Sequence, residues 1–278
     1  MIAYYNGKIG SGDDITIPLS DRSIYFGDGV YDVCIGENGI TFLLDEHIAR
    51  LLRSAKAIGI EHKYSHNMLC DIASSVIDRS GIEKYLLYIQ MTRNAKKRKH
   101  SDTACDTVNL LITVDEFTPP RKPASLKLIT VDDFRYKLCN VKTINLLPAV
   151  IASSRAEREG CDEAVLVLDG YVTECAHSNI SILRNGVLQT HHDCEKILPG
   201  ITKAHLLSAA RDLGITVREK PFGLSELYSA DEIIVTSTTK LIGIANSIDG
   251  IKVGGRDPER IRKLSEAIFA EYDNYCRL

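Results

Sequence analysis

Four segments of this 278-residue sequence carry residues whose types and spacing could do chemistry. The first is Lys142, within the short apolar and strand-like run 140–147. A lysine in such a run loses part of its hydration and can present a neutral amine. A neutral amine forms a Schiff base with an aldehyde. Taken alone, however, Lys142 fits a surface lysine on a half-buried strand better than a nucleophile.

The second segment centres on Glu174, between a predicted strand and the small polar residues 175–179. A carboxylate there could accept the N–H of a pyridinium ring, which keeps a pyridoxal ring electron-withdrawing. An ordinary glutamate at the end of a strand explains the same pattern.

Two further segments and one arginine could bind a phosphate. After the loop at Gly200 a helix is predicted to begin near Thr202, and a helix start offers free N–H groups to an anion. The hydroxyl residues 236–239 follow the predicted strand 232–235 and could donate to the same phosphate. Arg50, on a predicted helix, could pair with a phosphate through two parallel hydrogen bonds. A plain helix cap and a threonine-rich strand end remain alternatives.

Two other polar segments have simpler explanations. The basic run 96–100 reads as a solvated loop. Residues 191–194, His-His-Asp-Cys, have side chains that bind metals, but no second ligand cluster accompanies them. We therefore expect no metal site.

The elements that must position these residues indicate two α+β domains. A strand, an Asn6-Gly7 turn and a return strand are predicted over 2–9. Helices are predicted from an Asp45 N-cap to residue 60, over 67–82, and after Asn145 and Thr202. Further strands are predicted over 85–92, 107–114, 126–131 and 163–168.

Three prolines between residues 119 and 123 forbid a regular element there. We predict a smaller N-terminal domain over 1–117, a linker over 118–124, and a larger C-terminal domain over 125–278 that carries Lys142. A length of 278 residues suits two domains of about 150 residues each.

Composition excludes several classes of protein. The hydrophobic fraction of 44% and the charged fraction of 26% are ordinary for a folded chain. No apolar run approaches the ~20 residues of a membrane span, and a net charge of −3 argues against a sequence-blind nucleic-acid surface. Eight cysteines without a C-x-x-C pair, and no signal peptide, predict buried reduced thiols of a cytoplasmic protein.

Together these segments resemble the fold-type IV pyridoxal-phosphate enzymes. That group includes D-amino-acid (D-alanine) aminotransferases, branched-chain aminotransferases and aminodeoxychorismate lyases. The resemblance covers essentially the whole chain, and its motifs occur in the family's order: Asp21-Arg22, Phe26-Gly27-Asp28-Gly29-Val30-Tyr31, His47-Ile48-x-Arg50-Leu51, Val141-Lys142-x-x-Asn145-Leu146-Leu147, Val172-Thr173-Glu174, Ser178-Asn179, Gly200-Ile201-Thr202 and Thr236-Ser237-Thr238-Thr239.

The resemblance implies the cofactor pyridoxal 5'-phosphate and a role for each matching residue. Lys142 would hold the cofactor through a Schiff base and then act as general base and acid. Glu174 would bind the pyridine nitrogen, and Leu198 would pack against the ring. The phosphate would be anchored by Arg50, Ile201, Thr202, Ser237 and Thr238.

The pocket residues resemble the D-amino-acid aminotransferase pattern. In that subfamily Tyr31, Val33, Arg98 and His100 would line the substrate site, with Arg98 and His100 reaching over from the other subunit of a homodimer. The resemblance thus implies ping-pong transfer of the amino group from D-alanine or another D-amino acid to a 2-oxo acid. An aminodeoxychorismate lyase, a branched-chain L-amino-acid aminotransferase and a cofactor-binding protein without turnover are the alternatives.

Overall fold

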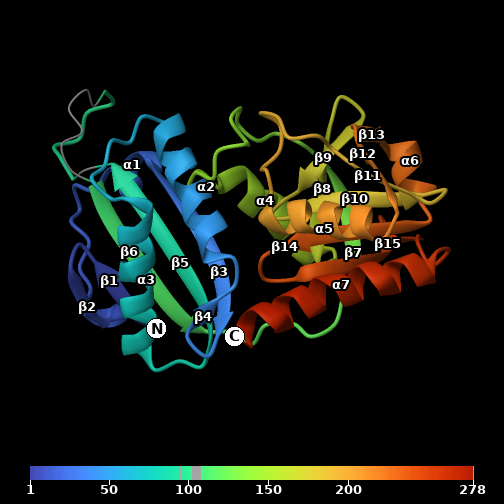
Figure 1. The fold of residues 1–278 in the computed structure, drawn as a ribbon. Helices are drawn as coiled ribbons and strands as arrows, with labels where there is room; N and C mark the ends of the chain where they lie inside the picture. Colours follow the sequence, from blue (N-terminus) through green and yellow to red (C-terminus); the bar gives the residue numbers. More distant parts are fainter. Residues whose placement is uncertain (94, 102–107, 278) are drawn as a thin grey trace. The chain divides into compact units, whose positions relative to one another are not determined.

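The computed structural model describes residues 1–93, 95–101 and 108–277. The chain divides into two compact units (Figure 1). The first comprises Met1–Pro119, Val141–Asn145 and Tyr275–Leu278, and the second comprises Pro120–Asn140 and Leu146–Asn274.

The first unit is built on a six-stranded antiparallel sheet with the strand order β2-β1-β6-β5-β3-β4. The predicted hairpin is confirmed, because Asn6 and Gly7, with φ of 48° and 98°, form the turn between its strands. The strands of the sheet are β1 (Ile2–Tyr5), β2 (Lys8–Ser11), β3 (Gly29–Glu37), β4 (Ile40–Thr41), β5 (Lys84–Arg93) and β6 (Val108–Glu116).

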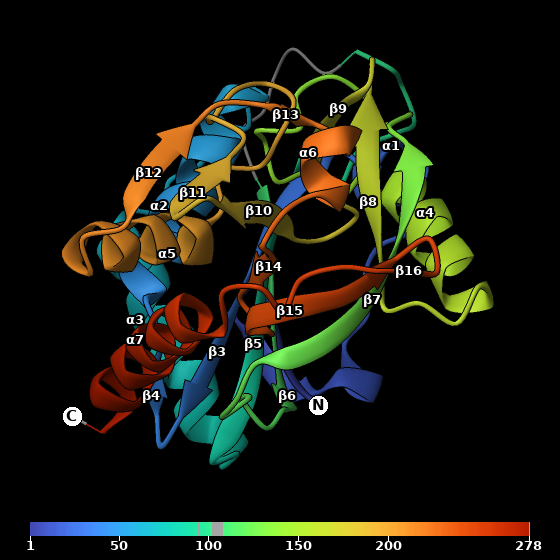
Figure 2. The same ribbon diagram turned by 90° about the vertical axis from the view of Figure 1, so that its right-hand side faces the viewer.

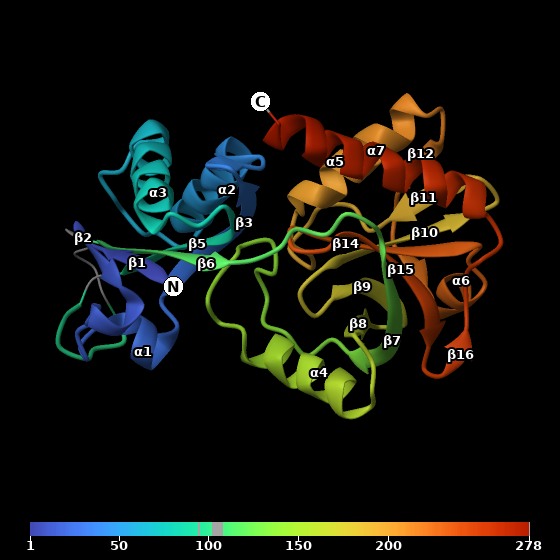
Figure 3. The same cartoon turned by 90° about the horizontal axis from the view of Figure 1, so that it is seen from below.

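Helices α2 (Leu44–Ala57) and α3 (His66–Ser80) lie on one face of this sheet, and the short α1 (Arg22–Phe26) lies on the other (Figure 3). A one-turn 3-10 helix, Gly12–Asp14, follows β2. Leu51 of α2, Leu69 of α3 and Leu87 of β5 are fully buried in the core between the helices and the sheet.

The two long helices were predicted at nearly the right places. The Ser65 hydroxyl accepts the N–H of Met68 and so caps α3. The predicted Asp45 cap of α2 is wrong, because α2 begins after Leu43. Leu43 is buried and has a φ of 54°, so packing fixes the start of α2. Asp45 instead lies in the first turn, where its charge suits the helix dipole.

The second unit has a ten-stranded mixed sheet with the order β12-β11-β10-β14-β15-β7-β8-β9-β13, and β16 pairs with β15. The sheet curls strongly, as Figure 2 shows. A buried apolar core in this unit includes Phe222 and Val235. The strands are β7 (Ala124–Asp132), β8 (Glu163–Leu168), β9 (Tyr171–Cys175), β10 (Asn179–Arg184), β11 (Val187–Thr190), β12 (Thr216–Glu219), β13 (Phe222–Gly223), β14 (Glu232–Ser237), β15 (Leu241–Ile248) and β16 (Ile251–Lys252).

Four helices belong to this part of the chain: α4 (Leu147–Arg158), α5 (Ile201–Asp212), α6 (Leu224–Tyr228) and α7 (Pro258–Cys276). The helices predicted after Asn145 and near Thr202 are therefore confirmed as α4 and α5. The strands predicted over 126–131, 163–168 and 232–235 are confirmed within β7, β8 and β14.

The domain division differs from the prediction in one respect that affects the site. The chain passes from the first unit to the second between Pro119 and Pro120, inside the predicted linker. Residues 141–145, however, belong to the first unit, so Lys142 does not lie in the unit predicted to carry it. The reason is pairing with β3: the N–H of Tyr31 donates to the Lys142 carbonyl at 3.0 Å, and the N–H of Ile144 donates to the Gly29 carbonyl at 3.1 Å. Apart from this pairing, Lys142 lies outside any regular strand.

The cysteines differ partly from the expectation. All seven in the described residues are free thiols, but only Cys34, Cys175 and Cys276 are buried, while the other four are half-buried. No helix in the described ranges is both long enough and apolar enough to cross a membrane.

Candidate active site

Lys142 is held by its backbone on both sides. The Ser54 hydroxyl accepts the N–H of Lys142 at 3.3 Å, and the Lys142 carbonyl accepts the N–H of Tyr31. The Lys142 Nζ then lies 4.4 Å from the centroid of the Tyr31 ring. The amine of a half-buried lysine is thus presented at a fixed place, as a nucleophile or a proton carrier requires.

Tyr31 shares its face of the sheet with the predicted substrate residue Val33. The Tyr31 ring stacks on Tyr88 of β5 at 5.4 Å, and Tyr88 is also the register partner of Val33. The Tyr88 hydroxyl donates to Gln90 Oε1 at 2.5 Å, and burial raises the pKa of that hydroxyl. The structure therefore brings Lys142, Tyr31 and Val33 to one place, beside a tyrosine that stays protonated.

Asp32 points to the opposite face of β3, where α2 supplies His47 and Arg50. The Arg50 Nε and Nη2 donate to the two Asp32 oxygens at 2.8 and 2.7 Å, and His47 Nδ1 lies 2.7 Å from Oδ1. Asp32 is 0% exposed. Burial alone would raise the pKa of Asp32, but Arg50 and His47 hold it well below its usual range. The pKa of His47 is lowered by burial, so its imidazole stays neutral near pH 7.

This arrangement orients Arg50, the predicted phosphate anchor, through a carboxylate that the sequence analysis did not select. The available signal was an aspartate on an apolar strand together with His47 and Arg50 three residues apart on one helix, a spacing that brings side chains together.

Arg98 and His100, the other predicted substrate residues, gather on α1. The Arg98 guanidinium and the His100 ring each lie 5.3 Å from the Phe26 ring. Arg22 fixes this loop by donating to the Lys99 carbonyl at 2.5 Å and to the His100 carbonyl at 3.0 Å. The Arg98 guanidinium and the His100 ring thus pack on α1, whereas the Tyr31 ring stacks on Tyr88 and faces the Lys142 amine.

In the second unit, Glu174 is buried in β9 and accepts several hydrogen bonds. Arg135 Nη1 donates to it, as do Asn179 Nδ2 at 2.9 Å and the N–H of Leu198 at 3.1 Å. Arg135 also donates to both oxygens of Asp133, at 2.9 and 2.8 Å. Two carboxylates thus share one guanidinium, and this cluster has a formal charge of −1, which suits a nearby cation.

Burial disfavours the charged forms of Arg135 and Asp133, but the ion pairing between these groups outweighs that effect. The pKa of Arg135 is raised by Asp133 and Glu174 although burial lowers it, and the pKa of Asp133 is lowered by Arg135 although burial raises it. Both groups are therefore charged near neutral pH. The sequence analysis missed Arg135 and Asp133, which follow β7 in a loop without periodicity.

Asn179 links Glu174 to the start of α5. Its Nδ2 also donates to the Leu198 carbonyl at 2.9 Å. Gly200 is the N-cap of α5 and no side chain caps the helix. A Cβ on Gly200 would lie 1.8 Å from Asn179 Oδ1, so only glycine fits there. The predicted phosphate residues Ile201 and Thr202 form the first turn, where N–H groups lack helical partners.

The other predicted phosphate residues, Ser237 and Thr238, end β14 and begin the turn that follows. Thr236 pairs with Asn179 across the sheet, so the turn lies beside the strand that carries Asn179. The Thr236 Oγ1 is buried, and the described part of the chain offers it no hydrogen-bond partner. An orphaned hydroxyl and an uncapped helix start are features that a bound polar group would satisfy.

Glu163, fully buried at the start of β8, joins this turn to the loop after β9. Its oxygens accept the N–H of His177 at 3.1 Å, the Ser178 hydroxyl at 3.0 Å and the Lys240 Nζ at 3.2 Å. Sequence analysis missed Glu163, because a glutamate at a strand start is common.

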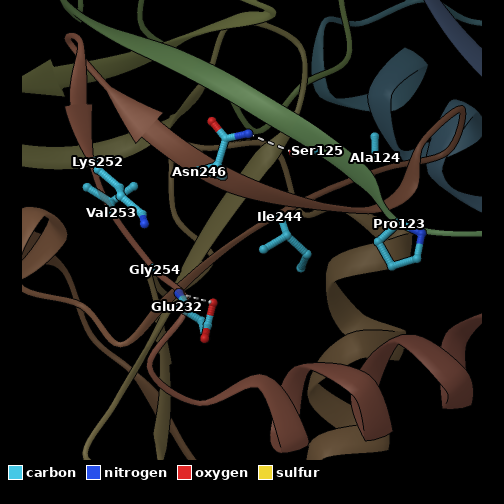
Figure 4. Close-up of a pocket in the computed structure, with 11 residues that line it drawn as sticks. Pro123, Ala124, Ser125, Glu232, Ile244, Asn246, Lys252, Val253 and Gly254 are labelled. Carbon is cyan, nitrogen blue, oxygen red and sulfur yellow. Dashed lines mark hydrogen bonds between the residues drawn. The ribbon is translucent and has the colours of Figure 1, made fainter.

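A pocket of about 280 Å³ in the second unit lies apart from these residues (Figure 4). Two of its polar side chains are already hydrogen-bonded: Asn246 Nδ2 donates to the Ser125 hydroxyl at 2.7 Å, and Glu232 Oε2 accepts the N–H of Gly255 at 3.0 Å. None of the predicted site residues lines it.

The curled mixed sheet, the six-stranded sheet and the polar groups in each define an enzyme of the fold-type IV class. The family model for amino-transferase class IV matches residues 29–248, and the chain belongs to this family. The predicted α+β fold of this class is confirmed.

Among the relatives, a D-alanine aminotransferase from Bacillus licheniformis is 36% identical over 95% of this chain and 94% of its own length. A D-alanine aminotransferase from Staphylococcus aureus (strain MSSA476) is 32% identical, with 97% and 96% of the two chains covered.

Solved structures of the same fold include branched-chain enzymes. The branched-chain amino acid aminotransferase of Escherichia coli superposes with a TM-score of 0.89 over 97% of this chain and 93% of that one, at 22% identity. The branched-chain aminotransferase of Thermoproteus uzoniensis, with norvaline, has a TM-score of 0.89 and 26% identity, and covers 100% and 97% of the two chains.

Proposed function

We propose that this aminotransferase moves the amino group from D-alanine or another D-amino acid to a 2-oxo acid, with pyridoxal 5'-phosphate as its cofactor. The observation that carries the proposal is the Glu174–Arg135–Asp133 cluster, whose formal charge of −1 suits a protonated pyridine nitrogen. The D-alanine aminotransferases that resemble the chain over nearly its full length support the choice of substrate.

The residues fit the cofactor at each of its ends. Glu174 would accept the ring N–H, and Leu198, whose N–H binds Glu174, would pack against the ring. The phosphate would bind Ile201 and Thr202 at the uncapped start of α5. Ser237, Thr238 and Arg50 would complete the phosphate site. When bound, the cofactor supplies an aldehyde for Lys142 and an electron-withdrawing ring that stabilises a carbanion.

The remaining steps belong to the protein. Lys142 Nζ would take the proton from the substrate α-carbon and would return it to the cofactor carbon beside the ring, since a single amine can act first as base and then as acid. The Tyr31 ring lies 4.4 Å from this amine, and Val33, on the same face of the sheet, would bound the substrate. Arg98 and His100 would bind the α-carboxylate in the site of the partner subunit, where a guanidinium suits a carboxylate.

A homodimer is part of the proposal. Leu147, Val150 and Ile151 of α4 are exposed and three and four residues apart, so they form one apolar helix face. Such a face on a folded chain marks a protein interface. Val150→Lys should therefore lower the mass found by light scattering from dimer to monomer, whereas Lys127→Ala, at an exposed site on β7, should leave it unchanged.

We also infer a cytoplasmic location from the free thiols.

The visible spectrum tests the reaction. The purified protein, loaded with pyridoxal phosphate, should lose its lysine-bound absorption band on addition of D-alanine and keep it with L-leucine. A response to L-leucine alone would favour a branched-chain enzyme, and release of pyruvate from aminodeoxychorismate without an amine acceptor would favour the lyase. Lys142→Ala should abolish turnover, whereas Lys127→Ala should keep the wild-type rate; a Lys142→Ala enzyme with the wild-type rate would refute the role of Lys142.

A further inference from the structure

Three side chains that bind metals meet at the N-terminal ends of α2 and α3. Cys70 Sγ lies 3.8 Å from His66 Nδ1 and 3.9 Å from Asp45 Oδ1. His66 Nε2 lies 3.6 Å from the same Asp45 oxygen. The imidazole therefore presents its edge to both partners, and a rotation of the ring would turn either nitrogen toward the centre of the group.

The separations of the three donor atoms can be compared with those of a zinc coordination shell. Zinc binds sulfur at about 2.3 Å and nitrogen or oxygen at about 2.0–2.2 Å, so two ligands of a tetrahedral ion lie roughly 3.3–3.6 Å apart. With one imidazole nitrogen as the His66 ligand, the three donor atoms lie within 4.8 Å of one another. Side-chain rotations that draw the three atoms together would complete the shell.

The two helices supply a rigid support. The Ser65 cap places His66 in the first turn of α3, and Cys70 follows four residues later on the same side of the helix. Asp45 comes from the first turn of α2, which packs against α3. The Asp45 side chain is 79% exposed and that of His66 is 34% exposed, so water can reach a fourth position.

The local charge favours a cation. The Asp45 carboxylate lies 3.9 Å from Cys70 Sγ and 3.6 Å from His66 Nε2, so a negative charge already faces the other two ligands. The positive ends of the two helix dipoles oppose a cation there, but dipole effects are weak at exposed helix ends and are screened by solvent, whereas the ligands would bond to the ion directly.

A second cluster of the same ligand types, His191, His192 and Cys194, provides a contrast. In both clusters one imidazole nitrogen faces a backbone carbonyl: His191 Nδ1 lies 2.8 Å from the His192 carbonyl, and His66 Nε2 lies 3.1 Å from the Asp45 carbonyl. Burial, and the nearby charges of Lys196 and Lys203, lower the pKa of His191, which indicates a positive potential. This second cluster therefore serves as an internal control.

We propose that Asp45, His66 and Cys70 form a Zn²⁺ site with a water molecule as fourth ligand. On binding, the Cys70 thiol loses its proton to solvent as the zinc–sulfur bond forms, and no electron is transferred. The sequence analysis overlooked the site because its ligands are 21 and four residues apart and belong to two helices.

The site would connect the start of α2 to α3. Because α2 also carries His47 and Arg50, bound zinc would steady the helix that orients the phosphate anchor. The expected effect is on the stability of the first unit, and it does not require that the transaminase proposal be correct.

The test is a calorimetric titration with Zn²⁺. The sample is the full-length protein, loaded with pyridoxal phosphate and stripped of metal with a chelator. The wild type should bind one equivalent, and Cys70→Ser and His66→Asn should each weaken binding at least tenfold. Cys194→Ser should bind like the wild type. X-ray absorption at the zinc edge should show one sulfur ligand in the wild type and none in Cys70→Ser.

Thermal unfolding gives an independent measurement. Zn²⁺ should raise the unfolding temperature of the wild type and of Cys194→Ser, and should not raise that of Cys70→Ser or His66→Asn. The proposal is overturned if Cys70→Ser and His66→Asn bind zinc as the wild type does, if only Cys194→Ser loses binding, or if the wild type binds none. Because none of these measurements uses turnover, their failure would leave the proposed reaction untouched.

Discussion

Replacing Asp32 with asparagine tests the buried ion pair that orients Arg50. The substitution keeps the size of the side chain and removes its charge. Arg50, which is 4% exposed, would then stay buried without its carboxylate partner. We expect Asp32→Asn to destabilise the protein far more than removal of an exposed aspartate from the same sheet.

The magnitude follows from the burial of both partners. Breaking a buried ion pair by neutralising one member costs about 3–5 kcal/mol. At ~2–4 °C per kcal/mol for a chain of this size, the unfolding temperature should fall by about 6–20 °C. Asp115→Asn is the matched control: its side chain is 42% exposed and lies 3.8 Å from the N-terminal amine, so it should cost ~0–1 kcal/mol.

Differential scanning calorimetry of the cofactor-free protein measures both variants, so that the proposed contact of Arg50 with the phosphate does not contribute. The double variant Asp32→Asn/Arg50→Gln removes both charges and should be no less stable than Asp32→Asn alone, since the cost comes from a buried guanidinium that has lost its carboxylate. The low pKa of Asp32 stabilises the folded state above the ordinary aspartate pKa of about 3.9, and this contribution is lost only at more acidic pH. The difference between wild type and Asp32→Asn should thus stay constant from about pH 7 to 8, where His47 is neutral, and should grow at lower pH because Asp32 favours the protonated form of His47.

Two results would refute this reasoning. One is an unfolding temperature for Asp32→Asn equal to that of Asp115→Asn. The other is a double variant with the summed losses of its two single variants, which would mean that Asp32 and Arg50 stabilise the fold independently.

Three further predictions concern the rest of the site. Because folding lowers the pKa of His47, the unfolded chain binds a proton that the folded chain does not, and stability should fall as the pH drops through about 6.5. The loss for this group is at most ~1.4 kcal/mol per pH unit. In urea unfolding, the difference in stability between pH 7.5 and pH 5.5 should be smaller for His47→Gln than for the wild type. Gly200→Ala must displace Asn179 from Glu174, so the dissociation constant for pyridoxal phosphate should rise about tenfold (~1.4 kcal/mol). Fluorescence titration measures this constant, and Gly10→Ala, at an open position, is the control. Glu163→Gln should lower the free energy of unfolding by ~3 kcal/mol and so lower the unfolding temperature. A variant as stable as the wild type would contradict the role of the buried Glu163 carboxylate in pairing with Lys240.

The sequence predicted most elements because their patterns are local. The strands with alternating or continuous apolar residues and the capped helix α3 follow from periodicity within about fifteen residues. The start of α2 was mispredicted because burial of Leu43 outweighs the capping preference of Asp45. The pairing of residues 141–145 with β3 could not be predicted, since it joins residues more than a hundred positions apart.

In the site, too, local patterns could be predicted and long-range contacts could not. The residue types of Lys142, Glu174 and the start of α5 are visible in single motifs. Their supporting partners are not, because Asp32 meets Arg50 and Glu163 meets Lys240 only after the sheets have formed. Sequence motifs name the groups that would touch a cofactor, whereas the charges that hold those groups depend on long-range packing.

The division of the chain has a consequence for its biosynthesis. The first unit contains residues 1–119, but it also needs 141–145 and the last turn of α7, where Tyr275 packs edge-on against Phe42 at 5.3 Å. On a ribosome, where chains emerge from the N-terminus first, this unit cannot finish folding until its final residues leave the exit tunnel. A nascent or truncated N-terminal half would expose the edge of β3 around Gly29 and Tyr31, and it would depend on chaperones to avoid aggregation.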